Sequence, residues 1–203
     1  MTANLVTIGE HTIDASLLTP RGWVLDAGCR DLTFARGLTE RGCRVMALDA
    51  DPTLVNPKIE NIDFYHFAIA ARRGNFYLHL ADNPEARCLV NADQIVEGQA
   101  YVVVMAFTIA DLLQMEKAKR FDAVKLDVEG AEYDILRTWP GPVAKQISVE
   151  FHEHVKPRPE KVYDDIFAHL GQWYDVVQHD KTRRHCTHPN FWDSLMILRE
   201  EFR

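Results

Sequence analysis

The stretch KLDVEGAE, residues 125–132, contains a concentration of carboxylates. It ends an apolar run that begins at Phe121. Ionised carboxyl groups held close together repel one another unless solvent, a helix N-terminus, a metal ion or a cationic ligand compensates their charge. One interpretation is helix capping, with Glu129 and Glu132 in a first turn whose free N–H groups favour negative charge. The other interpretation places Asp127 at the carboxyl end of a parallel strand, where open α/β sheets bind ligands.

The order of strand and helix patterns along the chain favours the second interpretation, a sheet that binds ligands at its strand ends. Residues 22–26 are typical of a buried strand, residues 32–41 of an amphipathic helix, and residues 44–49 of a second strand. Strand, helix and strand in this order form the unit of a parallel sheet. Further strands are predicted over 62–67, 76–80, 101–105, 123–127 and 146–152, with helices over 109–115, around 135–136 and over 162–170. The sequence therefore predicts an α/β, doubly wound, mostly parallel sheet.

The last two strand patterns differ from the rest because no helical pattern separates them. They cover residues 173–178 and 191–198, and their succession indicates an antiparallel pair that closes the sheet. The patterns show no sign of a second domain. We therefore expect one domain over residues 1–203, with residues 1–20 as an N-terminal extension packed on it.

Composition and charge exclude several classes of protein. No apolar run approaches the roughly 20 residues of a membrane helix, so we expect a soluble protein without a membrane partner. With 23 Lys and Arg against 30 Asp and Glu, the net charge of −7 opposes attraction to phosphate backbones and disfavours nucleic acid as a partner. The N-terminus lacks the pattern of a secretory signal. The cysteines lack the spacing of a zinc or redox motif and are predicted as core residues of a cytoplasmic protein: Cys29, Cys43, Cys88 and Cys186.

Two successive strand ends carry residues that suit an adenosine ligand. Asp26 and Gly28 close the first predicted strand, and Asp49 closes the second. A carboxylate at the second position can accept hydrogen bonds from both ribose hydroxyls, and a glycine lets a ligand approach the backbone. Arg30 and Thr33 stand where a dinucleotide fingerprint has its second and third glycines. S-adenosylmethionine, which has no phosphate and carries two cationic groups, matches these carboxylates better than a dinucleotide does.

Four segments resemble the FkbM-type S-adenosylmethionine-dependent methyltransferases. They are VLDAG at 24–28, ALDADP at 47–52, TIADLL at 108–113 and, most distinctive, VKLDVEGAE at 124–132. The resemblance covers most of the chain and includes a strand that ends in Val149 and Glu150. It implies the Rossmann-like, seven-stranded class I methyltransferase fold with an antiparallel last strand, and S-adenosylmethionine as cofactor.

The resemblance also implies roles for individual residues. Asp26 and Gly28 would lie beside the methionine part of the cofactor, Asp49 would hold the ribose diol, and Phe67 and Ala68 would flank adenine. The chain departs from the family in its first loop, where residues 29–32 replace the usual glycines, and in Asp rather than the commoner Glu at position 49. The altered loop leaves open a non-catalytic adenosine-ligand sensor or scaffold. An NAD-binding oxidoreductase is a further alternative, opposed by the missing glycines and the lack of a second catalytic domain.

The chemistry of methyl transfer identifies candidate catalytic residues. Transfer from a sulfonium requires alignment of the acceptor and exclusion of water, and a base helps when the acceptor is a hydroxyl. The candidate bases are Asp127 at the fourth parallel strand and Glu150 and His152 at the fifth, where equal parity places both on one face. The resemblance implies the hydroxyl of a small molecule or glycan as acceptor. A metal ion on His152, Glu153 and His154 is the alternative, but the prediction is metal-free because no ligand triad is fixed by spacing.

Other charged and aromatic residues receive weaker predictions. Lys125 should point away from the neighbours of Asp127, because a strand residue does not share a face with the residue next to it. The basic run at 181–185 suits either an acidic acceptor or a solvated connection between strands. Three residues are candidates for the acceptor side: His188, Asn190 and Trp192.

Overall fold

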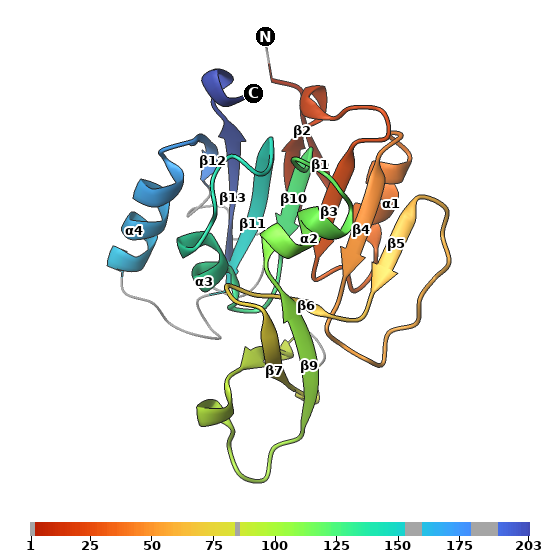
Figure 1. The fold of residues 1–203 in the computed structure, drawn as a ribbon, viewed down its shortest axis with the longest axis vertical. Helices are drawn as coiled ribbons and strands as arrows, with labels where there is room; N and C mark the ends of the chain where they lie inside the picture. Colours follow the sequence, from red (N-terminus) through yellow and green to blue (C-terminus); the bar gives the residue numbers. More distant parts are fainter. Residues whose placement is uncertain (1–2, 84–85, 153–159, 180–190) are drawn as a thin grey trace.

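The computed structural model describes residues 3–83, 86–152, 160–179 and 191–203, and its centre is a seven-stranded sheet (Figure 1). The strand order is β12-β13-β11-β10-β3-β4-β5. The five strands from β11 to β5 are parallel, whereas β13 is antiparallel to both its neighbours. This confirms the predicted fold class. The strands are β3 (Trp23–Ala27), β4 (Arg44–Leu48), β5 (Ile62–Tyr65), β10 (Ala123–Leu126), β11 (Gln146–His152), β12 (Tyr174–His179) and β13 (Phe191–Leu198).

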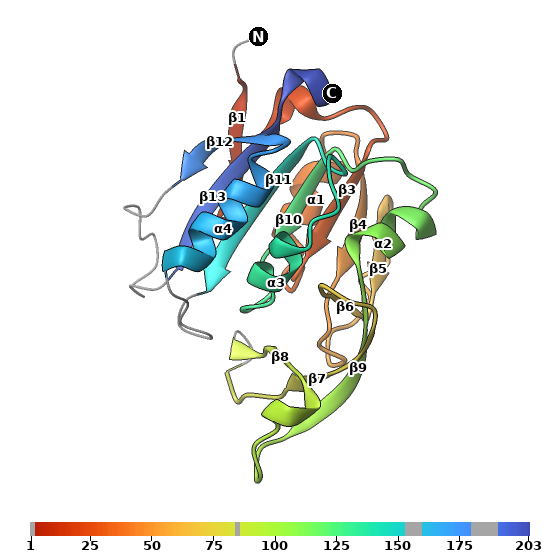
Figure 2. The ribbon, with the colours of Figure 1, turned by 60° about the vertical axis from the view of Figure 1, so that its left-hand side comes forward.

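Helices cover both faces of this sheet (Figures 1 and 2). Because strand residues alternate, Val24 joins the core under α1 (Thr33–Thr39), and Leu25 joins the core on the opposite face. The first core also contains Ile13 from the N-terminal hairpin. The opposite face carries α2 (Ile109–Met115), α3 (Glu132–Arg137) and α4 (Glu160–Leu170), and the remaining short elements are the hairpin strands β1 (Leu5–Ile8) and β2 (His11–Asp14) and the 3-10 helices η1 (Ala15–Leu17), η3 (Ala92–Gln94) and η4 (Glu200–Phe202).

A second, four-stranded sheet lies beyond the carboxyl ends of the parallel strands (Figure 2). It was not predicted as a unit, although residues 76–80 and 101–105 were predicted as strands. The antiparallel pairing of the two longer strands holds it together. The predicted strand over 62–67 ends at Tyr65, because the chain leaves the main sheet there to enter this one. Its order is β6-β9-β7-β8, with β6 (Ala68–Ile69), β9 (Tyr101–Phe107), β7 (Gly74–His79) and β8 (Leu89–Val90).

Local hydrogen bonds explain where the helices beside the strand ends begin. The α1 helix begins at Thr33, whose amide N–H donates to Asp31 Oδ1 at 2.9 Å. Two residues later the amide of Ala35 donates to Asp26 Oδ2 at 3.1 Å. The α2 helix begins after Thr108, which forms a reciprocal capping box with Asp111. The carboxylates at these positions satisfy N–H groups that a helix leaves unpaired.

Two composition-based expectations can be compared with the described residues. None of the helices described is both long and apolar enough to cross a bilayer. Cys29 and Cys43 are buried, as predicted, whereas Cys88 is only half-buried and Cys186 lies outside the described residues.

Candidate active site

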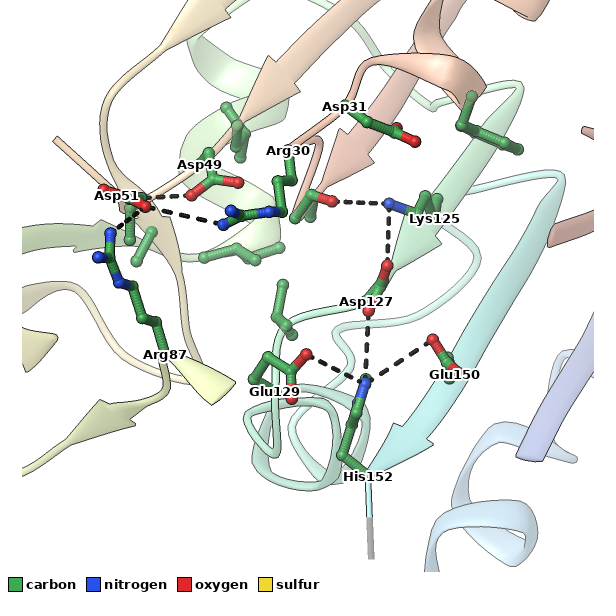
Figure 3. A pocket seen from close by; sticks show the side chains of 18 of the residues that line it. Arg30, Asp31, Asp49, Asp51, Arg87, Lys125, Asp127, Glu129, Glu150 and His152 are labelled. Carbon is green, nitrogen blue, oxygen red and sulfur yellow. Dashed lines mark hydrogen bonds and ion pairs between the residues drawn. The ribbon is translucent and has the colours of Figure 1, made fainter. Parts of the chain in front are cut away.

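A cavity of about 780 Å³ opens at the carboxyl ends of β3, β4, β10 and β11 (Figure 3). The turn of the N-terminal hairpin and residues of the small sheet complete its walls. The cavity is therefore assembled from segments that are distant in sequence. All the predicted site residues except Asp26 line it: Gly28, Asp49, Phe67, Ala68, Asp127, Glu150 and His152.

Asp26 faces the protein interior rather than the cavity. The residue is fully buried. One carboxylate oxygen caps α1 through the amide of Ala35, and the other lies 3.1 Å from Lys125 Nζ. Asp26 therefore joins α1 to β10, and the predicted direct contact with a cofactor has no support in this geometry. The signal for this role lies in the strand register, since Asp26 and Lys125 are directly paired across β3 and β10.

Lys125 and Asp127 are two residues apart, and the alternation of strand residues places such a pair on one face. The ammonium of Lys125 lies 3.3 Å from Asp127 Oδ2 and donates a hydrogen bond of 2.8 Å to the carbonyl of Gly28. Asp26 and Asp127 outweigh the effect of burial and raise the pKa of Lys125 above its ordinary value.

Gly28 is required by the packing of the loop that carries it. Its φ of +78° is a conformation that side chains rarely adopt, and a Cβ there would lie 1.7 Å from the carbonyl oxygen of Asp127. Its amide donates to the carbonyl of Leu48 at 2.9 Å. This glycine therefore holds the ends of β3, β4 and β10 together beneath the cavity.

One end of the cavity, the Asp49 end, comprises Asp49, Asp51, Arg30 and Arg87 (Figure 3). Asp49 Oδ1 accepts the amide of Asp51, and burial raises the pKa of Asp49. Asp51 pairs with Arg87, which comes from the small sheet, and lies 3.8 Å from Arg30 Nη1. Burial opposes the charged form of Asp51, but hydrogen bonds from Thr53 and the charge of Arg87 lower its pKa. This end therefore carries two carboxyl groups and two guanidinium groups, and both guanidinium groups face Asp51.

Apolar side chains form the wall next to the Asp49 end. Phe67 and Ala68 lie there, and the ring of Phe67 is 4.7 Å from that of Phe107. Leu78 and Leu89 of the small sheet also line the cavity. The small sheet thus supplies part of the slot that was predicted for adenine.

The opposite end, the His152 end, comprises Asp127, Glu129, Glu150 and His152 (Figure 3). His152 Nε2 lies 3.5 Å from Asp127 Oδ1, 3.5 Å from Glu129 Oε1 and 3.7 Å from Glu150 Oε2. The predicted convergence of Asp127, Glu150 and His152 is therefore present in the geometry. Glu129 is an additional member that the sequence interpretation assigned to the following helix.

Glu129 and Glu132 differ from the expected helix-capping pair. Glu129 precedes α3 in a turn with a φ of +50° and faces His152. Glu132 begins α3 but is fully buried, and its Oε1 accepts hydrogen bonds from His152 Nδ1 at 2.6 Å and from the amide of Val128. Both carboxylates therefore serve the His152 end. The spacing of these two residues was the available sequence signal. Because a turn precedes the helix, both side chains can face the same strand end.

The crowding of these groups shifts their protonation. Burial and the charge of Asp127 raise the pKa of Glu150 to about 8. Burial opposes the charged form of His152, but Glu132, Glu129 and Asp127 raise its pKa to about 10. Burial likewise opposes ionised Asp127, yet Lys125 holds its pKa far below the usual range. At neutral pH His152 is therefore a fixed cation, while Glu150 can accept or release a proton.

His11 is a member of the cavity that the sequence interpretation missed. Its Nδ1 is 3.2 Å from Ser148 Oγ, and its Nε2 is 3.7 Å from Asp127 Oδ2. The alternating pattern of residues 11–14, after a glycine, was the available signal for the hairpin that carries it. Several predicted residues cannot be compared: Glu153, His154, the run 181–185, His188 and Asn190 lie outside the described residues, as does the side chain of Trp192.

The amino-acid sequence and the fold of this chain were compared with those of known proteins. A family model described as the methyltransferase FkbM domain matches residues 28–175. No curated protein gives a significant match. The chain is similar to a solved fibrillarin–Nop5p complex (10% identity, TM-score 0.52, 90% of this chain and 75% of that chain) and to the fibrillarin pre-rRNA processing protein of Methanococcus jannaschii (11% identity, TM-score 0.50, 97% and 83%). A TehB-like methyltransferase from Corynebacterium glutamicum is 10% identical, with a TM-score of 0.47 over 91% and 86% of the two chains. The two fibrillarin structures show a shared fold.

Proposed function

Because the chain belongs to the FkbM methyltransferase family, and so depends on S-adenosylmethionine, we propose that it methylates a hydroxyl oxygen of a small molecule or glycan. The observation that carries the proposal is one cavity with two chemically different ends. The Asp49 end offers a carboxylate beside an apolar slot. The His152 end offers a carboxyl group that can exchange a proton near neutral pH.

The residues present fit the cofactor. Asp49 keeps one carboxylate oxygen beyond the one that accepts the amide of Asp51, and a ribose diol needs acceptors of this kind. Phe67 and Ala68, together with leucines of the small sheet, offer apolar surface for a planar base. When bound, S-adenosylmethionine supplies an electrophilic methyl group on a positively charged sulfonium. The excess of carboxylates toward the His152 end suits that charge.

We assign different tasks to the residues of the His152 end. Glu150 is the proposed base, because it lines the cavity and can receive the proton of an acceptor hydroxyl. Asp127 remains charged beside Lys125 and would accept a hydrogen bond that orients the acceptor. His152 would act as a fixed cation that keeps Glu150 and Asp127 together, rather than as the base assigned from sequence.

The proposal is tested by offering hydroxyl-bearing acceptors with ¹³C-methyl-labelled S-adenosylmethionine. Mass spectrometry detects the methyl increment, and the ¹³C chemical shift of the product distinguishes an O-methyl from an N-methyl group. We expect an O-methyl product. Methylation only at nitrogen would contradict the assignment of oxygen, and binding of S-adenosylmethionine without any transfer would favour the sensor alternative.

The role of Glu150 has its own test. Glu150→Gln removes the proton acceptor and keeps the size of the side chain, so kcat should fall by about 10²- to 10⁴-fold. The dissociation constant of S-adenosylmethionine, measured by calorimetry, should stay close to that of the wild-type protein. An unchanged kcat would remove Glu150 from the chemical step.

A further inference from the structure

The His152 end has the geometry of a metal site. The ligand-type atoms of Asp127, Glu129 and His152 lie within 4.8 Å of one another. In a site with metal–ligand bonds of about 2.0–2.2 Å, neighbouring ligand atoms lie about 3.0–3.5 Å apart. The distances of 3.5 Å from His152 Nε2 to Asp127 Oδ1 and Glu129 Oε1 are close to those edges.

The imidazole of this cluster is held as metal-binding histidines usually are. A ligating histidine donates its second ring N–H to a carboxylate, backbone carbonyl or water, which fixes the ring and its tautomer. His152, with a side chain only 2% exposed, is held through Nδ1 by Glu132 Oε1 at 2.6 Å, and Glu132 is itself fully buried. This arrangement aims Nε2 at Asp127 and Glu129. A buried carboxylate used to orient one imidazole is an observation separate from the acidic cluster.

The position of Lys125 determines which side of Asp127 can take a cation. A second group of suitable ligands, His11, Asp127 and Glu150, is also close together. His11, however, faces Asp127 Oδ2, the oxygen that lies 3.3 Å from the ammonium of Lys125. A metal ion there would be repelled by the ammonium. Asp127 Oδ1 faces away toward His152 and Glu129, where carboxylates outnumber cations.

We propose that Asp127 Oδ1, Glu129 and His152 Nε2 bind one divalent metal ion, with its open positions toward the cavity and Glu150. Two carboxylates and one imidazole suit a transition-metal ion that also accepts oxygen ligands, such as Mn²⁺. On binding, Nε2 releases its proton to solvent, because only a neutral imidazole can be a ligand, and the ion replaces the positive charge that His152 carries in the metal-free protein. The ion would bind the acceptor hydroxyl and lower its pKa, which leaves Glu150 to receive the proton. This catalytic role rests on the proposed function, whereas binding of the ion does not.

The experiment is a titration of the metal-free full-length protein with Mn²⁺, followed by electron paramagnetic resonance of the free ion. Calorimetry with S-adenosylmethionine is run on the same samples. We expect saturable binding of one Mn²⁺ per chain. S-adenosylmethionine binding without Mn²⁺ binding would overturn the metal site and leave the methyltransferase assignment intact. Mn²⁺ binding without S-adenosylmethionine binding would support the metal site and contradict the cofactor assignment.

Matched variants locate the ion. Glu129→Gln should weaken Mn²⁺ binding by at least about tenfold and should leave S-adenosylmethionine binding unchanged, which also shows that the variant is folded. Asp49→Asn should give the reverse result, because it lies at the other end of the cavity. His11→Gln should bind Mn²⁺ as the wild-type protein does. If His11→Gln loses the ion while Glu129→Gln retains it, the assigned ligand set is wrong.

Discussion

At the Asp49 end of the cavity, Asp51 is paired with Arg87 and lies near Arg30, whereas at the His152 end four acidic side chains surround a single imidazole. The first arrangement has as many guanidinium groups as carboxyl groups and includes the exposed Arg30. In the second, which surrounds a buried imidazole, the carboxyl groups outnumber the cations. The Asp49 end therefore suits a neutral sugar and base. The His152 end requires a cation, either a bound ligand or a side chain of the protein.

The two ends also differ in how the chain builds them. Asp49 and Asp51 follow β4 directly, so one strand end supplies both carboxylates. The His152 end combines the turn after β10, the first residue of α3 and the end of β11. Its charges can coexist only if these elements are held in register. Lys125 joins the turn after β10 to β3, because it contacts Asp26, Asp127 and the carbonyl of Gly28.

Of the substitutions that test this difference between the two ends, removal of Lys125 should have the largest effect on stability. Lys125→Met leaves the fully buried Asp26 and the half-buried Asp127 without their cation, which should lower the free energy of unfolding by about 3–5 kcal/mol. Urea denaturation followed by circular dichroism measures the loss.

The matched control for Lys125→Met is Lys161→Met. Lys161 pairs with Asp165 at 2.9 Å on the surface, where its side chain is 79% exposed. Such pairs contribute only about 0.3–0.5 kcal/mol. Equal losses for the two variants would show that Lys125 does not carry the charge balance of the His152 end.

The Asp49 end was the more predictable of the two from sequence, for a physical reason. Asp49 follows a strand end, and the carboxyl ends of parallel strands meet at one edge of a sheet, so local patterns were enough to place it there. The same reasoning placed Asp127 beside Glu150 and His152. The family resemblance added Phe67 and Ala68. The strands of the main sheet were predictable from their sequence patterns, whereas their number, seven, was implied by the family resemblance.

What the sequence could not reveal depends on contacts between distant segments. The burial of Asp26 requires the register of β3 against β10. The approach of His11 requires the hairpin to dock beside β11, and that of Arg87 requires the small sheet to fold over the strand ends. The contacts of Lys125 with Asp26 and with the carbonyl of Gly28 also require the register of β3 against β10. These positions are set by tertiary packing, which a single sequence encodes only indirectly.

The comparison is sharpened by exchanging one carboxylate for its amide at each end. Asp49→Asn should weaken S-adenosylmethionine binding by about 10- to 100-fold, since hydrogen bonds to a charged acceptor contribute about 1.5–3 kcal/mol. Asp127→Asn should change this affinity far less and should reduce turnover instead. Calorimetry and initial rates measure the two effects. Comparable losses of affinity in both variants would mean that the ends do not divide the two tasks.

The smallest expected effect concerns the pairing of Asp51 with Arg87. Arg87→Met removes one cation but leaves the hydrogen bonds from Thr53 to Asp51, so the free energy of unfolding should fall by only about 1–2 kcal/mol. The matched control is Arg199→Met, which loses an exposed pair with Asp175. A loss as large as that of Lys125→Met would contradict the view that only the His152 end depends on an internal cation.

The loss of stability in Arg87→Met should depend on pH, because Arg87 interacts with ionised Asp51. Arg87 helps to lower the pKa of Asp51 below its ordinary value, although burial opposes this. A carboxyl group with a lowered folded-state pKa adds stability above its unfolded-state pKa of about 3.9, and loses it as the pH falls through the folded-state value. The stability difference between wild type and Arg87→Met should therefore be largest above about pH 5 and shrink on acidification. Thermal denaturation across this range would show the trend, and a difference that grows in acid would mean that Arg87 does not act through ionised Asp51.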